Sequence, residues 1–386
     1  MKKVTLLLLV AAILTIPVQA QVKVAPMNIK HRTLANGLNV VSLVETSSPT
    51  VAIHVWYDVG GKNDPPGRSG FAHMFEHMMF KSTRNMKSEM MDRLTEDIGG
   101  FNNASTWDDF TNYYEVVPSN HLERLLWAES DRMVNLNVDE ANFSSEREVV
   151  KEEYRQSVLS QTYGRFFEYI TSLSYAVHPY KRGVIGNLDE LSAATRADAE
   201  AFYKTFYRPD NAWLIVVGDF DQAQFDGWVD NYFGPLAKPS GSIPRVTETE
   251  PERADMKSFE RTAPRVEFPA VALTYLGPPS KSADIPALRV AEAIMSGGES
   301  TRLYLDLVRP GIAQEVNYYN DLRVDRTLLV YYAIAAEGKT TVEMQNAILG
   351  VVSKMQKVAV PNMELQKAKN QLVAQALKSR ENNDGK

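Results

Sequence analysis

The sequence predicts an α+β fold of two related domains, the second shorter than the first. Three observations lead to this prediction. Strand-like runs and helical patterns alternate along the chain, a polar segment rich in proline and glycine near residue 240 interrupts them, and the elements after this segment loosely repeat the order before it. A length of 386 residues also fits two domains.

The N-terminus has the pattern of a secretory signal peptide, residues 1–20. A basic pair, Lys2-Lys3, precedes an apolar run that ends in the small-residue motif Val18-Gln19-Ala20. The run is shorter than the ~20 residues of a membrane-spanning helix, and a retained signal anchor is the alternative. We expect a secreted or periplasmic protein that starts at Gln21 and has no membrane span after cleavage.

Composition excludes several kinds of partner and site. Without the signal peptide the chain has 40 basic and 48 acidic residues, and a net charge of −8 disfavours nucleic acid as a partner. The chain has no cysteine, which excludes disulfides, thiolate ligands and a cysteine nucleophile. Any metal site must therefore use histidine and carboxylate side chains.

The first domain is expected to cover residues 28–240. Asn36-Gly37 between two strand-like runs predicts a hairpin, the run Val51–Val59 alternates like a strand, and Ala212–Val217 is a further strand. Helical patterns lie between these strands, at Gly70–Phe80, Ser88–Ile98, His121–Leu136, Ser145–Leu159 and Arg196–Phe206.

The predicted linker is Lys238–Pro244, with the domain boundary near 240–254, and the second domain is expected to cover residues 255–386. Its 132 residues compare with more than 200 in the first, so we expect it to be truncated. The predicted elements are strands at Ala270–Leu276 and Leu328–Ala336 and helices at Ala287–Met295 and Arg302–Val308.

The strongest functional signal is the apolar helix Gly70–Phe80, in which His73, Glu76 and His77 are the only polar side chains. Positions i and i+4 share a helical face, so both imidazoles can reach one ion with Glu76 beside them. Two core histidines one turn apart are the alternative, but a glutamate directly before the second histidine makes a chance pair rare. H-x-x-E-H is the inverted form of a zinc-hydrolase motif.

A catalytic zinc site needs a third protein ligand and one open position. Residues 144–153 resemble a helix opened by a capping box, with Ser145 as N-cap and Glu148 three residues later. Glu146 and Glu153 are seven residues apart and share one face of this helix. A solvated charged helix is the alternative for this segment taken alone.

On these motifs the chain resembles the M16 metallopeptidase family, which includes pitrilysin, insulin-degrading enzyme and the mitochondrial processing peptidase. The resemblance implies that each domain is a mainly antiparallel sheet covered by helices, and that each chain binds one Zn2+. It implies that His73, His77 and Glu153, which lies 76 residues after His77, hold the metal, with Glu152 as the fallback. Glu76 would be the general base of peptide-bond hydrolysis.

The resemblance also assigns supporting residues. Glu146, two turns before Glu153, matches an acidic position that supports the metal site. The segment Gly99–Thr106 resembles the family's G-G-x-x-N-A-x-T strand, an exposed edge to which a peptide adds through main-chain hydrogen bonds. Its substrate-binding role falls to Asn103, Ala104 and Thr106, and an ordinary strand after a turn is the alternative.

The remaining histidines lack partners at ligand spacing. His178, in a His-Pro-Tyr segment followed by Gly186, also matches the family, and we interpret it as structural. His31, His54 and His121 are interpreted as core or surface residues.

One departure from the family pattern concerns an Arg followed seven residues later by a Tyr in the C-terminal half. Leu307 and Gln314 stand at these positions, and Arg302 or Arg309 could substitute only after a shift. We therefore predict a zinc endopeptidase for extended peptides, working with an M16-family partner subunit that supplies the Arg/Tyr pair. The alternatives are an inactive peptide-binding subunit of such a heterodimer and a structural zinc domain, which would need four protein ligands.

Overall fold

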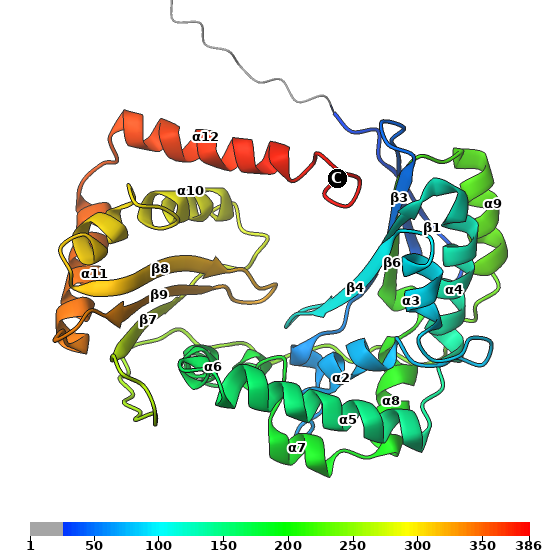
Figure 1. Cartoon of the computed structure of the whole chain (residues 1–386), viewed down its shortest axis with the longest axis horizontal. Coiled ribbons are helices and arrows are strands. Elements are labelled where there is room, and N and C mark those ends of the chain that lie inside the picture. Colours follow the sequence, from blue (N-terminus) through cyan, green and yellow to red (C-terminus); the bar gives the residue numbers. More distant parts are fainter. Residues whose placement is uncertain (1–25) are drawn as a thin grey trace, which may run out of the picture.

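The computed structural model describes residues 26–386; the predicted signal peptide lies outside the described residues. Two sheets, each with its own helices, form two lobes that face each other, and helix α6 (Gly164–Ser172) lies between them (Figure 1). Within residues 26–386, no helix has both the length and the apolar character needed to cross a bilayer.

The first lobe contains a six-stranded sheet in the order β1-β2-β6-β3-β5-β4. All neighbours are antiparallel except β2 and β6, so the expectation of a mainly antiparallel sheet is confirmed. The predicted hairpin at Asn36-Gly37 joins the first two strands. The strands are β1 Lys30–Thr33, β2 Asn39–Val44, β3 Thr50–Tyr57, β4 Phe101–Thr106, β5 Thr111–Pro118 and β6 Ala212–Gly218.

Helices pack on this sheet through a large aromatic core. The Phe75 ring stacks on Phe202 and Tyr203, and Tyr113 on β5 contacts Tyr207 through a hydroxyl–hydroxyl bond of 3.0 Å. This packing fixes the apolar face of the helix that carries the histidines. The helices are α2 Phe71–Met78, α3 Met90–Glu96, α4 Leu122–Asn135, α5 Glu140–Tyr154, α7 Leu188–Ala193, α8 Arg196–Phe206 and α9 Gln222–Tyr232.

The predicted start of the helix near residue 145 is wrong. The helix α5 begins at Glu140, because the Asp139 carboxylate accepts the backbone N–H of Asn142 at 2.8 Å and caps it more than a turn earlier. Ser145 therefore lies inside the helix, where its hydroxyl donates to Glu146. Beyond Tyr154 the chain continues as a π-helical turn, Arg155–Leu159.

The second lobe contains a three-stranded antiparallel sheet, β7 Ala270–Leu276, β9 Leu328–Ala335 and β8 Ala313–Asp321, in that order. The sequence did not predict β8, since its run of Asn, Tyr and Asp lacks a clear apolar alternation. Residues 233–269 connect the lobes without helix or strand and include the predicted linker, while the domain limits stay predictions. The helices are α10 Ile285–Met295, the π-helical turn Tyr304–Val308, α11 Thr341–Lys357 and α12 Asn362–Lys378.

Candidate metal centre

The helix with the two histidines is positioned at its N-terminus by a buried carboxylate. Asp64 accepts the backbone N–H groups of Gly70 at 2.7 Å and Ala72 at 2.9 Å. Burial raises the pKa of Asp64 to about 7, against the opposing effect of these N–H groups. These hydrogen bonds hold the loop between Asp64 and Gly70 against the start of α2, a contact that hydrophobic periodicity in the sequence does not predict.

Two glycines bring a second segment against the same helix terminus. Gly186 has φ +78°, and a Cβ there would lie 2.4 Å from the Ser69 carbonyl oxygen. Gly70 has φ +89°, and a Cβ there would lie 2.8 Å from the Ile185 carbonyl oxygen. Only glycine permits this approach, which places segment 181–186 beside α2.

Three side chains on α2 and α5 converge. Glu153 Oε2 lies 3.6 Å from His73 Nε2 and 3.4 Å from His77 Nε2. One potential ligand atom from each residue lies within 4.8 Å of the others, and two imidazole nitrogens with one carboxylate oxygen are a donor set that suits zinc. Glu152, the fallback, is exposed and pairs with Arg155 instead. We call His73, His77 and Glu153 the metal cluster.

The other ring nitrogen of His77 faces Glu146. Glu146 Oε2 lies 3.7 Å from His77 Nδ1, and Glu146 Oε1 lies 2.9 Å from Lys81 Nζ. A carboxylate on the far side of a ligating histidine orients the ring and raises its basicity. Lys81 in turn holds Glu146, a role that its position one turn after His77 could have suggested.

The ionisation of the side chains around the metal cluster favours the binding of a positive charge. Burial lowers the pKa of His73 to about 4. Burial also acts to lower the pKa of His77, but the carboxylates of Glu146 and Glu153, which accept its N–H groups, outweigh this effect and raise the pKa to about 9. Burial opposes a low pKa for Glu146, but His77 and Lys81 lower it to about 2. The pKa of Glu153 is also lowered, chiefly by its bond with His77. Ionised carboxylates around two imidazoles therefore fit a bound divalent cation.

A cavity of about 270 Å3 opens on the metal cluster and joins it to the edge strand β4. Burial raises the pKa of Glu76 in this cavity, against the opposing effect of Thr106. Ser105, Val184 and Ile185 were not predicted as site residues, because only the fold brings them to α2. The lining residues are His73, Glu76, Ala104, Ser105, Thr106, Glu153, Val184 and Ile185.

Asn103 is the one predicted substrate-binding residue that does not line this cavity. It is exposed, and its side-chain oxygen accepts the backbone N–H of Ala104 at 2.8 Å. Strand β4 pairs only with β5 among the described strands, so its other edge is free. The side-chain oxygen of Asn103 is therefore bonded to a backbone N–H, that of Ala104, which an added strand would use.

The remaining histidines lie outside the metal cluster. His178 is buried, its Nδ1 accepts the N–H of Tyr180 at 3.2 Å, and its Nε2 lies 3.4 Å from Asp325. His31 stacks on Trp213 and His54 pairs with Asp384. His121 precedes α4.

The positions predicted to lack the Arg/Tyr pair are engaged in other contacts or turned to solvent. Leu307 is fully buried in the core of the second lobe, and Gln314 is exposed on β8. Arg302 is held by Glu364 through bonds of 2.8 and 2.7 Å, and Arg309 is exposed.

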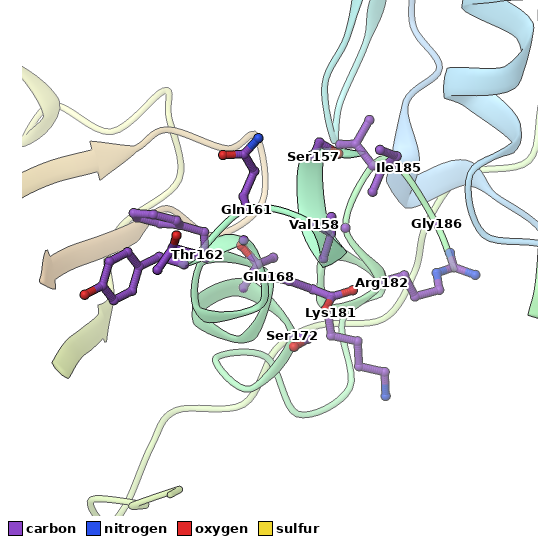
Figure 2. A pocket seen from close by; sticks show the side chains of 16 residues that line it. Ser157, Val158, Gln161, Thr162, Glu168, Ser172, Lys181, Arg182, Ile185 and Gly186 are labelled. Carbon is purple, nitrogen blue, oxygen red and sulfur yellow. The ribbon is translucent and has the colours of Figure 1, made fainter. Parts of the chain in front are cut away.

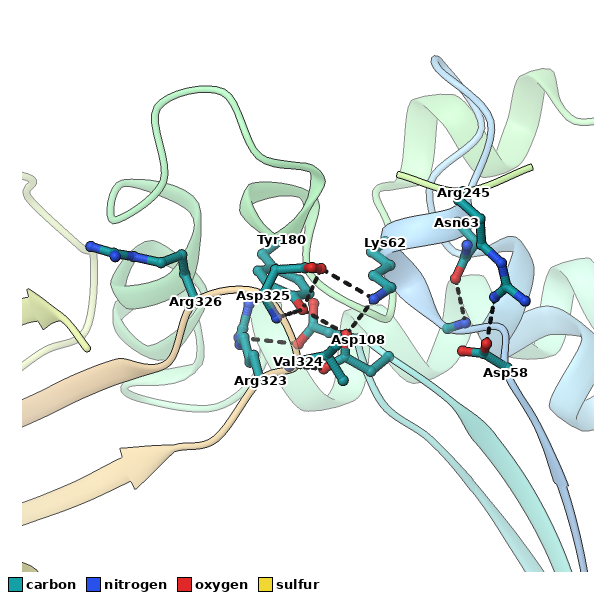
Figure 3. A network of polar contacts seen from close by, with 12 residues as sticks. Asp58, Lys62, Asn63, Asp108, Tyr180, Arg245, Arg323, Val324, Asp325 and Arg326 are labelled. Atoms are coloured by element: carbon teal, nitrogen blue, oxygen red, sulfur yellow. Dashed lines mark hydrogen bonds and ion pairs between the residues drawn. The ribbon is translucent and has the colours of Figure 1, made fainter. Parts of the chain in front are cut away.

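A polar network next to the metal cavity joins the two lobes. Figure 3 shows Lys62, Tyr180 and Asp325 turned toward one another. Lys62 Nζ lies 2.7 Å from Asp109 at the β4–β5 turn and 3.2 Å from Asp325 at the β8–β9 turn. We call the following residues the lobe contact: Lys62, Asp108, Asp109, Tyr180, Arg323 and Asp325.

Comparisons with known proteins point to one family. A family profile described as "Insulinase (Peptidase family M16)" matches residues 39–187, and one described as "Peptidase M16 inactive domain" matches residues 193–372. The chain is 32% identical to "Zinc protease PqqE" of Helicobacter pylori, over 88% of this chain and 78% of that protein. It is 25% identical to "Probable mitochondrial-processing peptidase subunit beta" of Arabidopsis thaliana, over 89% of this chain and 66% of that protein.

A solved structure supports the same fold. The crystal structure of a protease from Helicobacter pylori superposes with a TM-score of 0.89 at 29% sequence identity, covering 93% of this chain and 87% of that one. Both lobes are therefore arranged as in this neighbour.

Proposed function

Because the chain belongs to the M16 peptidase family, we propose that it is a zinc-dependent endopeptidase acting on extended peptides or unfolded protein segments. The observation that carries this proposal is the convergence of His73, His77 and Glu153, two of which, His73 and Glu153, line one cavity together with Glu76 and residues 104–106 of β4. The donor set, the neighbouring base and the peptide-binding edge then serve one reaction.

Each side chain has a separate task in this proposal. His73, His77 and Glu153 would hold one zinc ion, whose positive charge acidifies water and polarises a carbonyl oxygen. Glu76 takes a proton from the attacking water and gives it to the leaving amine. Its buried position raises its pKa and so makes it a stronger base than an exposed glutamate.

Strand β4 accounts for the substrate class. A peptide can add to its free edge only in an extended conformation, through main-chain hydrogen bonds. The hydrogen bond from the N–H of Ala104 to the side-chain oxygen of Asn103 would first have to break. Folded proteins cannot present such a strand, so unfolded segments are the expected substrates.

Replacing Glu76 tests its role in turnover separately from zinc binding. Glu76→Gln is expected to retain zinc and to lose turnover by about 100-fold or more, because general-base catalysis has this size. His77→Ala is expected to lose both zinc and turnover. Turnover of quenched peptides and zinc content are measured on the same samples; undiminished turnover in Glu76→Gln contradicts the assignment.

A second candidate function is a weakly active or inactive peptide-binding subunit of an M16-type heterodimer. Buried Leu307 and exposed Gln314 at the Arg/Tyr positions favour it, and the relative from Arabidopsis thaliana is named as a subunit. In this case a partner chain supplies the Arg/Tyr pair, which would stabilise the developing oxyanion. Efficient peptide hydrolysis by the purified chain alone would exclude a need for this partner.

We also propose export to the periplasm or the exterior, from the pattern of residues 1–20. N-terminal sequencing of the mature protein should start at Gln21. Retention of residues 1–20 in a membrane fraction would instead indicate a signal anchor.

A further inference from the structure

A second, larger cavity adjoins the metal cavity. It has a volume of about 650 Å3 and lies between the end of α5, helix α6 and segment 181–186 (Figure 2). Val184 and Ile185 line both cavities, so the two are neighbours across this segment. We call it the side-chain cavity.

The same element carries a metal-cluster residue and a wall of the side-chain cavity. Glu153 lies in the last turn of α5, and the π-helical turn that follows contributes Ser157 and Val158 to the wall. The Ser157 hydroxyl also donates to the Glu153 carbonyl oxygen at 2.8 Å. The distance between the cavity and the metal cluster is therefore fixed by a continuous helix.

The walls of the side-chain cavity are mainly apolar. Phe167 on α6 is 42% exposed although it lines a cavity, and Val158, Tyr163, Val184 and Ile185 complete the apolar surface. Covering an exposed aromatic ring of this kind with an apolar group is favourable by the hydrophobic effect.

Each charged side chain of the wall makes one hydrogen bond to a neutral group of the protein, and the buried Arg182 Nε has no partner among the described residues. Glu168 accepts the Tyr154 hydroxyl at 2.8 Å, Lys181 donates to the Ala176 carbonyl at 3.1 Å, and Arg182 donates to the Lys62 carbonyl at 3.0 Å. A charged ligand would have to compete with these bonds. The apolar part of the wall around Phe167, Val184 and Ile185 is therefore the part that suits an uncharged side chain.

The second lobe holds the ring of Phe167 in place. Phe167 packs edge-to-face on Tyr332 of β9, with ring centroids 5.3 Å apart, and Phe166 also contacts Tyr332. Tyr163 donates its hydroxyl to the Phe268 carbonyl at 3.0 Å. Phe167 is thus fixed by the second lobe and Tyr163 by the connection just before β7, neither of which contributes to the metal cluster.

We propose that the side-chain cavity is a specificity pocket, in which Phe167 selects a large aromatic or aliphatic side chain of the peptide that lies along β4. This inference rests on the proposed peptide-binding function. The volume accommodates such a side chain with its flanking backbone. Because the pocket stands at a fixed position relative to the metal cluster, the selected residue stands at a fixed offset from the cleaved bond.

The test uses the zinc-loaded full chain and a mixture of unstructured 12-residue peptides of varied sequence. Mass spectrometry of the products should show Phe, Tyr, Leu or Met enriched roughly ten-fold or more at one offset from the cleaved bond. Phe167→Ala should lose this enrichment while it still cleaves the mixture. Phe259→Ala, which removes a ring that is 50% exposed outside both cavities, should keep it.

A second variant guards against a folding defect in Phe167→Ala. Thr171→Trp adds bulk beside Phe167, one turn further along α6, and should also abolish the enrichment. No preference at any offset, or a preference for a charged residue, overturns the proposal. So does enrichment that survives in both variants.

A binding measurement separates this proposal from the proposed hydrolysis. If no peptide is cleaved, the activity of the lone chain fails, and fluorescence anisotropy then compares labelled peptides that carry Phe or Gly at the same position. Tighter binding of the Phe peptide by roughly ten-fold, lost in Phe167→Ala, supports the pocket. Equal binding of both peptides contradicts it.

Discussion

The metal cluster and the lobe contact are both dense groups of ionisable side chains, and they differ in how their charge is balanced. In the lobe contact, Lys62 and Arg323 lie directly against Asp109, Asp325 and Asp108. Around the metal cluster, Glu76, Glu146 and Glu153 face two imidazoles, and the Lys81 ammonium is paired with Glu146. The first group has two cations in direct contact with its three carboxylates, whereas the second has one ammonium for its three carboxylates and suits an added divalent ion.

From this difference we infer a structural role for the lobe contact and a metal-binding role for the metal cluster. Removing a member of the lobe contact should cost stability and leave zinc binding intact. Removing a member of the metal cluster should cost zinc and leave the zinc-free fold nearly as stable. The following variants test this division.

The neighbouring residues Glu153 and Glu152 form a matched pair. Glu153→Gln should weaken zinc binding by more than about 100-fold, since a ligand matters more than an outer-shell group. Glu152→Gln should leave the affinity unchanged, because Glu152 pairs with Arg155. Competition titration against a chromogenic chelator measures both, and equal losses would contradict the assignment of Glu153.

Replacing Glu146 should weaken zinc binding less than replacing Glu153. Glu146→Gln is expected to weaken zinc binding by about 10–100-fold, because its carboxylate orients His77 without being a ligand. Lys81→Met should act in the same direction, since Lys81 holds Glu146. A loss as large as that of Glu153→Gln would show that Glu146 is itself a ligand.

Lys62→Met tests the lobe contact. It leaves Asp109 and Asp325 without their ammonium and should lower the free energy of unfolding by about 2–3 kcal/mol, with zinc content unchanged. Lys204→Met, at a 75% exposed side chain, is the control and should change stability by less than about 0.5 kcal/mol. Urea denaturation measures both. Loss of zinc in Lys62→Met with no loss of stability would reverse the proposed division.

Asp108 should make the stability of the lobe contact depend on pH. Burial raises its pKa from an ordinary 3.8 to about 7, with Asp321 and Asp109 adding to the shift and Arg323 opposing it. The folded state therefore binds this proton more tightly than the unfolded state. The resulting stabilisation is complete below pH 4 and is lost as the pH rises through 7.

Asp108→Asn should remove this contribution. Between pH 5 and pH 8 the wild type should lose about 2–3 kcal/mol more of its free energy of unfolding than the variant, measured by urea denaturation at each pH. An identical pH dependence of the two proteins would show that Asp108 does not titrate in this range.

The sequence predicts the local parts of this molecule well. The H-x-x-E-H helix is an apolar segment whose polar residues share one face, so periodicity alone places His73 and His77 together. The spacing to Glu153 came from family resemblance, and the fold brings this residue to both imidazoles. The hairpin at Asn36-Gly37 is likewise a local signal.

The sequence fails where distant segments decide the outcome. Asp64, Val184 and Ile185 reach the site only through tertiary contacts with the start of α2 or with its cavity. The predicted start of α5 was wrong because Asp139 and Ser145 are both residue types that cap helices. The hydrogen bond from the Asn142 N–H to the Asp139 carboxylate identifies Asp139 as the N-cap. Local patterns therefore identify candidate ligands better than the residues that form the surrounding cavity walls.

X-ray absorption at the zinc edge of the purified full chain tests whether His73, His77 and Glu153 bind zinc with one position left open. We predict one zinc per chain, bound by two imidazole nitrogens and one carboxylate oxygen, with a remaining position taken by water. The same spectrum is expected for Lys62→Met, and no zinc-edge signal is expected for His77→Ala, which should bind no zinc. A chain that retains no zinc, or a shell of four protein ligands without an open position, would contradict the account.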